Sequence, residues 1–178
     1  MKNCLRICAL LLGVLLALGL CACGKEDLLA PDGYQLASNL DVVEYKLYVP
    51  NSWTVDERTG FTSAYCNAVD RSNISVMAVE LSQVVTPAEY FATYRADFES
   101  QFGAMDMVSE NTELLIAQSA AAQYVYKIAK LGTEYQIMQV VCIHGARAYL
   151  ITFTATTERY EEHTADLEDI LKFFSFTK

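Results

Sequence analysis

The sequence predicts an α+β fold, in which a largely antiparallel β-sheet is flanked by helices. Three observations lead to this prediction. Eight segments show the alternation or the short apolar runs that are typical of β-strands. Two other segments carry apolar residues at helical spacing. In chain order these segments give four strands, a helix, four strands and a second helix.

The first group of strands begins at residue 42. Val43, Tyr45, Leu47 and Val49 alternate with more polar residues, as in a half-buried strand, and Pro50 ends the pattern. Further strands are predicted at 53–55, 61–66 and 74–81, with Trp53 in the core. The polar residues 67–73 join the last two strands, which indicates a hairpin.

The first helix has the clearest local signal in the chain, the sequence Thr86-Pro87-Ala88-Glu89. Threonine is a good N-cap, proline suits the first helical position, and a glutamate three residues after the threonine completes a capping box. Gly103 is the expected end. Four aromatic residues recur at helical spacing and are expected to pack in the core: Phe91, Tyr94, Phe98 and Phe102.

The second group of strands is predicted as a meander. Its four strands are expected at about 105–117, 121–130, 134–143 and 147–156, with tight turns at Leu131-Gly132 and His144-Gly145. Several of these runs, 137–143 among them, are apolar on both faces. Central strands that are covered on both sides have this composition.

The second helix is predicted at about 158–174. One apolar face is expected from residues at i, i+4, i+7, i+11 and i+14, namely Tyr160, Thr164, Leu167, Leu171 and Phe174. His163 lies among acidic residues that flank this face, so we expect it to face water. His144 is expected to be an exposed turn residue.

The amino terminus has the pattern of an export signal. Lys2 and Arg6 precede 16 uncharged, mostly apolar residues, a run too short for a typical membrane span. Leu20-Cys21-Ala22-Cys23 resembles a bacterial lipobox, in which a signal peptidase cuts before a lipidated cysteine. We therefore predict cleavage between Ala22 and Cys23, diacylglyceryl modification of Cys23, and acylation of its amino group, as by palmitate. Cys21 is the less suitable thiol, because a bulky leucine precedes it.

These features divide the chain into a signal peptide (1–22), a lipidated cysteine with a short tether or entry loop (23–41), and one α+β domain (42–178). Three of the six cysteines leave with the signal and Cys23 carries lipid. Only Cys66 and Cys142 remain, so one disulfide is possible in an exported protein. Both residues lie in strand-like runs, where a reduced cysteine behaves as a small apolar residue, and we favour two free thiols.

Charge and motifs exclude several classes of function. Removal of residues 1–22 reduces the basic residues from 13 to 11 against 22 acidic ones, a net charge of −11, which argues against nucleic acid as a partner. The sequence contains no P-loop, dinucleotide-binding glycine motif, EF-hand or nucleophile elbow, and after Cys23 it has no paired-cysteine or Cys/His zinc motif. We therefore expect no catalytic residue, no metal and no cofactor.

The mature domain also resembles the PsbP-like fold family, which includes the extrinsic photosystem II subunit, a Ran-binding import factor and many bacterial lipoproteins. The matching stretches are Gly33-Tyr34-Gln35-Leu36, Tyr45-Lys46-Leu47-Tyr48-Val49-Pro50-Asn51-Ser52-Trp53, Asp70-Arg71-Ser72-Asn73-Ile74-Ser75-Val76, Tyr149-Leu150-Ile151-Thr152-Phe153-Thr154 and Ile170-Leu171-Lys172-Phe173-Phe174-Ser175-Phe176. This resemblance implies an antiparallel sheet sandwiched by helices. It implies no shared catalytic residue, and functions differ among such proteins.

Three functions remain open. The leading hypothesis is a non-enzymatic binding or accessory domain, monomeric, anchored through lipid to the membrane of a bacterial cell envelope and facing a protein partner there. The alternative is a small-ligand carrier with a pocket between sheet and helix, lined by aromatic residues such as Tyr124, Tyr126 and Tyr135. An enzyme would require a cleft that gathers His163 or His144 with carboxylates and a nucleophile.

Overall fold

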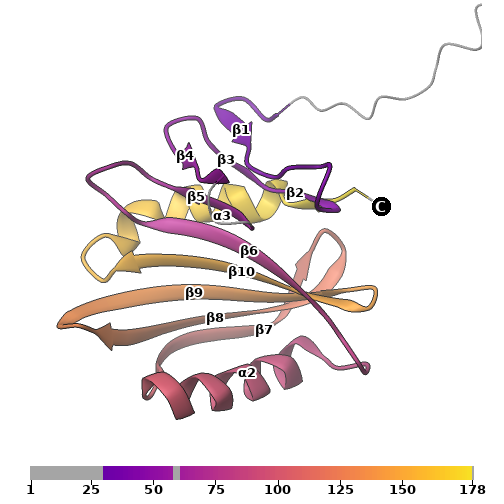
Figure 1. Cartoon of the computed structure of the whole chain (residues 1–178), viewed down its shortest axis with the longest axis vertical. Coiled ribbons are helices and arrows are strands. Elements are labelled where there is room, and N and C mark those ends of the chain that lie inside the picture. Colours follow the sequence, from indigo (N-terminus) through magenta and orange to yellow (C-terminus); the bar gives the residue numbers. More distant parts are fainter. Residues whose placement is uncertain (1–29, 58–60, 178) are drawn as a thin grey trace, which may run out of the picture.

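A computed structural model describes residues 30–57 and 61–177 of the chain. Its centre is a twisted antiparallel sheet with the strand order β4-β5-β6-β10-β9-β8-β7 (Figure 1). The strands are β4 (Thr54–Val55), β5 (Thr62–Tyr65), β6 (Asn73–Glu80), β7 (Asp106–Ile116), β8 (Ser119–Lys130), β9 (Thr133–His144) and β10 (Arg147–Thr156). The last four form the meander that the sequence predicts. The α+β fold class is confirmed.

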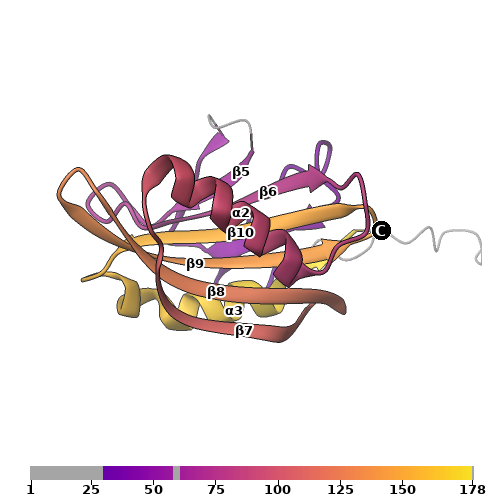
Figure 2. The same ribbon diagram turned by 90° about the horizontal axis from the view of Figure 1, so that it is seen from below.

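Two helical segments cover opposite faces of this sheet (Figures 1 and 2). Helix α2 (Pro87–Phe102) crosses one face. On the other face lie a 3-10 turn, η2 (Tyr160–His163), and helix α3 (Thr164–Phe173). No helix among the described residues is long and apolar enough to span a membrane.

The residues before β4 belong to the folded domain as well. Strand β1 (Tyr34–Leu36) pairs with β3 (Tyr48–Pro50), and β2 (Tyr45–Lys46) pairs with β11 (Ser175–Phe176) near the end of the chain. We expected the domain to begin at residue 42, so the structure moves this boundary to β1 or earlier. A three-residue strand is too short to show an alternation that sequence analysis can recognise.

Strand β9 contributes to two separate cores, one on each face of the sheet. Met138, Val140 and Cys142 point into the larger core, whereas Ile137 and Val141 point into the smaller core beneath α2. The apolar composition of residues 137–143 on both faces is explained by this position, and the prediction of a central, doubly covered strand is confirmed.

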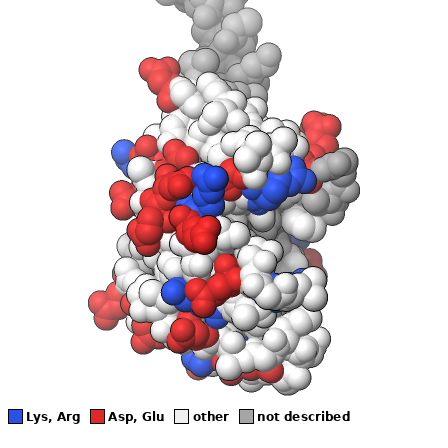
Figure 3. Space-filling model, turned by 90° about the vertical axis from the view of Figure 1, so that its left-hand side faces the viewer, with Lys and Arg blue, Asp and Glu red and all other residues white. Residues whose placement is uncertain are grey.

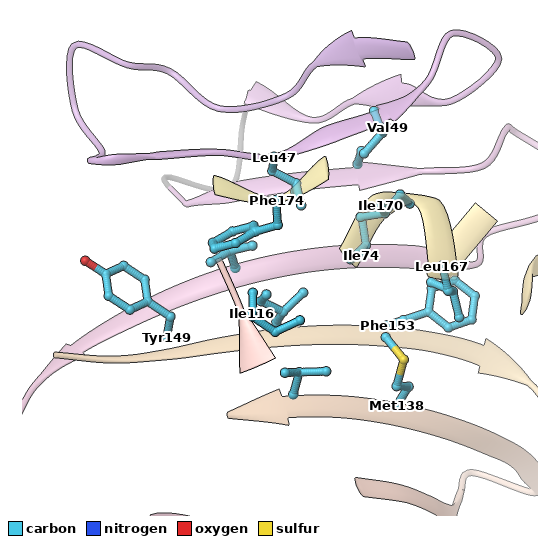
Figure 4. Close-up of a cluster of buried hydrophobic side chains, with 14 of the residues drawn as sticks. Leu47, Val49, Ile74, Ile116, Met138, Tyr149, Phe153, Leu167, Ile170 and Phe174 are labelled. Carbon is cyan, nitrogen blue, oxygen red and sulfur yellow. The ribbon is translucent and has the colours of Figure 1, made fainter. Parts of the chain in front are cut away.

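Helix α3 closes the larger core. Figure 4 shows Leu167 and Ile170 of α3 turned toward Phe153 and Ile74 of the sheet. The side chains at the centre of this core are almost completely excluded from solvent. Burial of such large apolar side chains is the main source of stability in a domain of this size.

The capping box of α2 is confirmed. The backbone N–H of Glu89 donates to Thr86 Oγ1 at 3.2 Å, and the backbone N–H of Thr86 donates to the Glu89 carboxylate at 2.8 Å. The aromatic residues of this helix are less buried than predicted. Phe91 is the helix's fully buried side chain, while Phe102 is 68% exposed in the last turn.

The buried face of the second helical segment differs from the predicted one. Its buried residues are Tyr160, His163, Leu167, Ile170 and Phe174. Thr164 and Leu171, which we expected on this face, are only partly buried. His163 therefore faces the protein interior, not water, and the expectation for this residue was wrong. The physical reason is a carboxylate partner, because a buried histidine is stable when its ring nitrogens are paired.

Candidate functional site

The most concentrated group of polar side chains in the described interior lies where the β5–β6 loop meets η2. The loop supplies Asp70, which is 9% exposed, and the last residue of η2 supplies His163, which is 6% exposed. His163 Nε2 lies 2.8 Å from Asp70 Oδ2. This contact joins residues 93 positions apart and fixes the start of the second helical segment to the edge of the sheet.

The β5–β6 loop is folded so that Asp70 points inward. Asn67 Oδ1 accepts hydrogen bonds from the backbone N–H groups of Val69 and Asp70, which forms a compact turn. The backbone N–H and the hydroxyl of Ser72 then donate to Asp70 Oδ1 at 2.9 and 2.6 Å. Ser72 therefore holds one carboxylate oxygen and leaves Oδ2 for His163.

These contacts set the charge state of Asp70. Burial alone would raise the pKa of its carboxyl group, but the hydrogen bonds from Ser72 and the contact with His163 outweigh burial and lower the pKa to about 2. Asp70 is therefore an anion at neutral pH.

His163 lies between two carboxylates and two aromatic rings. Its Nδ1 is 3.8 Å from Asp166 Oδ2, on the side opposite to Asp70. The rings of Trp53 and Phe153 meet the imidazole edge to face, each at 5.7 Å between centroids. Trp53 is 3% exposed, so it is a core residue that also forms a wall of this site. The aromatic walls hold the imidazole plane in place.

Cys66 completes the cluster. Its sulfur, an Asp70 oxygen and a His163 nitrogen all lie within 4.8 Å of one another. Burial, followed by the negative charge of Asp70, raises the pKa of the Cys66 thiol. A reactive cysteine has a lowered pKa, so this environment does not activate Cys66 as a nucleophile. The structure thus gathers His163 with carboxylates and a thiol, as the enzyme hypothesis requires, but the raised pKa of Cys66 gives that hypothesis no activated nucleophile at this residue.

Both cysteines in the described part of the chain are free, so the structure lacks the Cys66–Cys142 bridge that the sequence left open. Cys142 is fully buried in β9, and burial raises the pKa of its thiol to about 12. It packs as a small apolar side chain.

A hollow of about 310 Å³ opens beside the cluster. Asp70 lines its inner side, together with Tyr135 and Arg159. Two arginines line the hollow: Arg159, whose Nη1 is 2.9 Å from Glu162, and Arg71, whose guanidinium lies 4.4 Å from the centre of the Tyr65 ring. Figure 3 shows the end of the molecule where the second helical segment begins; acidic side chains predominate there and basic ones are interspersed among them.

The other residues considered from the sequence lie elsewhere. Ala22 and Cys23 fall outside the described residues. At the β9–β10 turn, His144 contacts Ser119 Oγ at 2.8 Å and stacks on Phe176. Sequence reasoning named Asp70 only as part of a stretch that carries the family resemblance and gave it no role in a site.

The aromatic residues proposed for a carrier pocket are divided between two places. Tyr124 stacks on Phe91 with 3.5 Å between ring centroids, and Tyr126 is buried beside them. Side chains therefore fill the space between the sheet and α2 at these residues, and the aromatic pocket expected there is not formed. Only Tyr135 lines an open hollow.

The lowered pKa of Asp70 predicts a loss of stability in acid. The group's ordinary pKa is 3.8, so between about pH 4 and pH 2 the unfolded chain binds the proton more readily than the folded one. The stability that the ionised Asp70 gives to the folded protein is fully present above about pH 4, and it is lost as the pH falls toward 2. We expect a loss of about 2 kcal/mol, measurable by urea denaturation across this range. Asp70→Asn should remove this part of the pH dependence, and Asp106→Asn, at an exposed position of β7, should retain it.

Comparison with known proteins supports the fold. No protein-family model and no curated protein matches the chain. Among solved structures, the chain is similar to the cyanobacterial PsbP (CyanoP) of Synechocystis sp. PCC 6803, with a TM-score of 0.59 and 14% identity over 89% of this chain and 99% of that one. It is also similar to a Pseudomonas aeruginosa protein of unknown function, with a TM-score of 0.52 and 18% identity over 79% of this chain and 94% of that one. LpqN of Mycobacterium tuberculosis, involved in cell envelope biogenesis, gives a TM-score of 0.51 and 14% identity over 85% of this chain and 83% of that one. The chain therefore has a PsbP-like fold.

Proposed function

We propose that this chain is a lipoprotein of the bacterial cell envelope, anchored to the membrane through Cys23, whose exported domain acts by binding a partner and not by catalysis. The observation that carries the proposal is the short distance along the sequence between the lipobox cysteine and the first strand. Residues 24–33 separate Cys23 from β1. At about 3.5 Å per residue they reach at most about 35 Å, so the anchored domain would act close to the membrane surface.

The polar cluster supports binding over catalysis. Asp70 and His163 are paired with each other, and the local environment raises the pKa of the Cys66 thiol instead of lowering it. The association of the similar LpqN with cell envelope biogenesis is consistent with an envelope location. The domain would then be an accessory protein, present to hold or position another component.

Anchoring is tested by substitution of Cys23. In Cys23→Ser the thiol that receives diacylglycerol is missing, so we expect an unprocessed precursor without lipid. Intact-mass spectrometry of the wild-type protein should show loss of residues 1–22 and gain of the lipid. Cys21→Ser is the matched control, because it removes the neighbouring thiol and should leave processing normal. Normal maturation and membrane retention of Cys23→Ser would refute the anchor.

Partner binding is tested by crosslinking in the native cell. A photoreactive amino acid at Asn73, which lines the hollow beside Asp70, should give a discrete crosslinked species. The same group at Leu131, a 97% exposed turn residue at the tip of the β8–β9 hairpin, is the control for random encounters. Identical crosslinking patterns from the two positions would count against a partner at the hollow.

A further inference from the structure

We propose that Cys66, Asp70 and His163 form a binding site for a divalent transition-metal ion of the Zn²⁺ type. This inference goes beyond the proposed function and reverses the expectation, drawn from the sequence, that the chain holds no metal. No spacing motif marks the site, because Cys66 and Asp70 lie in the β5–β6 loop, whereas His163 comes from η2, far away in the sequence. The fold brings the three together.

The type of donor selects the class of metal. One thiolate, one imidazole and one carboxylate form a set that suits zinc and the neighbouring divalent transition metals, whereas magnesium and calcium prefer oxygen donors alone. The three donor atoms already lie within 4.8 Å of one another. Tetrahedral zinc with ordinary bond lengths places its ligand atoms about 3.3–3.6 Å apart. The 2.8 Å contact between Asp70 and His163 would therefore open by about half an ångström around the ion.

Neighbouring groups hold two of the three ligands in the orientation that a metal requires. Ser72 binds Asp70 Oδ1 with two hydrogen bonds, which presents Oδ2 to the ion. The Asp166 carboxylate is 3.8 Å from His163 Nδ1, so that nitrogen can keep its proton while Nε2 serves as ligand. A carboxylate hydrogen-bonded to the far nitrogen of a metal-binding histidine is a common feature of zinc sites, and a shift of a few tenths of an ångström would bring Asp166 within hydrogen-bond distance.

The surroundings leave room for a fourth ligand. Three protein ligands with an open position are typical of zinc sites that also bind water or another small ligand. Of the three proposed ligands, Asp70 lines the hollow of about 310 Å³, so a fourth ligand would approach the ion from the side of this carboxylate. Arg159 and Arg71 also line the hollow, but the pairing of Arg159 with Glu162 and the position of Arg71 over the Tyr65 ring reduce their repulsion of a cation.

Cobalt binding to the full-length protein in detergent tests this site. Co²⁺ should give the near-ultraviolet charge-transfer band of a thiolate ligand, and Zn²⁺ should abolish it by displacement. The band should be lost in Cys66→Ser, whose sulfur is outside the Asp70–His163 pair, so the variant should remain folded. Cys142→Ser is the matched control and should keep the band. Each variant loses one thiol and keeps all other cysteines. Loss of the band in Cys66→Ser but not in Cys142→Ser therefore assigns the thiolate ligand to Cys66.

Zinc affinity, measured by competition with a chromophoric chelator, tests the other two ligands. His163→Gln and Asp70→Asn should bind Zn²⁺ at least about 10-fold more weakly than wild type, and Asp166→Asn about 10-fold more weakly through its effect on His163. His144→Gln, which changes the chain's other histidine, should bind as wild type does. In addition, Zn²⁺ should raise the melting temperature of wild type but not of Cys66→Ser. Equal zinc affinity in wild type and Cys66→Ser, or loss of the cobalt band in Cys142→Ser alone, would overturn the proposal.

Discussion

Replacement of His163 by alanine is expected to lower the free energy of unfolding by roughly 3–5 kcal/mol, the usual cost of leaving a buried charge, here the Asp70 carboxylate, without its partner. The change removes the partner of the Asp70 carboxylate, which is only 9% exposed and whose second oxygen is already occupied by Ser72. It also removes the ring that lies against Trp53 and Phe153. Urea denaturation at neutral pH, without added metal, measures the effect.

His144→Ala is the matched control for this prediction. His144 also makes a hydrogen bond and an aromatic stack, but it lies at a turn and is not buried. We expect it to cost about 1 kcal/mol or less. A double-variant cycle with Asp70→Ala should show that the two losses in the Asp70–His163 pair are not additive, because both changes break the same contact. Equal losses for the two histidines would mean that the buried pair contributes no special stability.

Local sequence signals predict much of this fold correctly. The capping box at Thr86 places the start of α2 at the right residue, because both of its hydrogen bonds form within four residues of chain. The four strands of the meander are also predicted to within a few residues, since each strand has its own alternating pattern or apolar run. One turn between these strands has no glycine. Ala117 and Gln118 both adopt positive φ there, although the sequence gives no sign of it.

The buried face of the second helical segment could not be predicted in the same way. Apolarity suggests Leu171 for this face, yet the structure turns Ile170 and His163 inward. The choice depends on Asp70, which supplies a partner for His163 from a loop far away in the sequence. The periodicity of apolar residues gives no information about such a partner. A prediction based on it therefore places a polar residue such as His163 on the face that contacts water.

The candidate site was beyond sequence analysis for the same reason. Cys66 and Asp70 lie in the β5–β6 loop and His163 in η2, and their spacing matches no metal or catalytic motif. Each residue also has an ordinary alternative role, as a strand, loop or surface residue. Only the register between β5 and β6, together with the docking of η2 on the sheet, brings the three side chains within reach of one another.

Replacement of Phe91 by alanine is the second change for which we expect a large loss, roughly 3–5 kcal/mol in the free energy of unfolding. Phe91 is the fully buried side chain of α2, and its ring lies parallel to that of Tyr124 at 3.5 Å between centroids. Its removal leaves a cavity between the helix and the sheet, since Tyr124 and Tyr126 belong to strand β8 and cannot move to fill the space. Urea denaturation measures the loss.

The same substitution at the other end of the helix provides the control. Phe102 is 68% exposed, so Phe102→Ala should change stability by less than about 0.5 kcal/mol. Hydrogen exchange then separates loss of docking from loss of the whole fold. If Phe91 is the main contact between α2 and the sheet, Phe91→Ala should increase exchange in α2 at denaturant concentrations where β9 and β10 remain protected. The smaller core and the larger core lie on opposite faces of the sheet. Simultaneous loss of protection in α2 and in these central strands would show instead that the two cores unfold together as one cooperative unit.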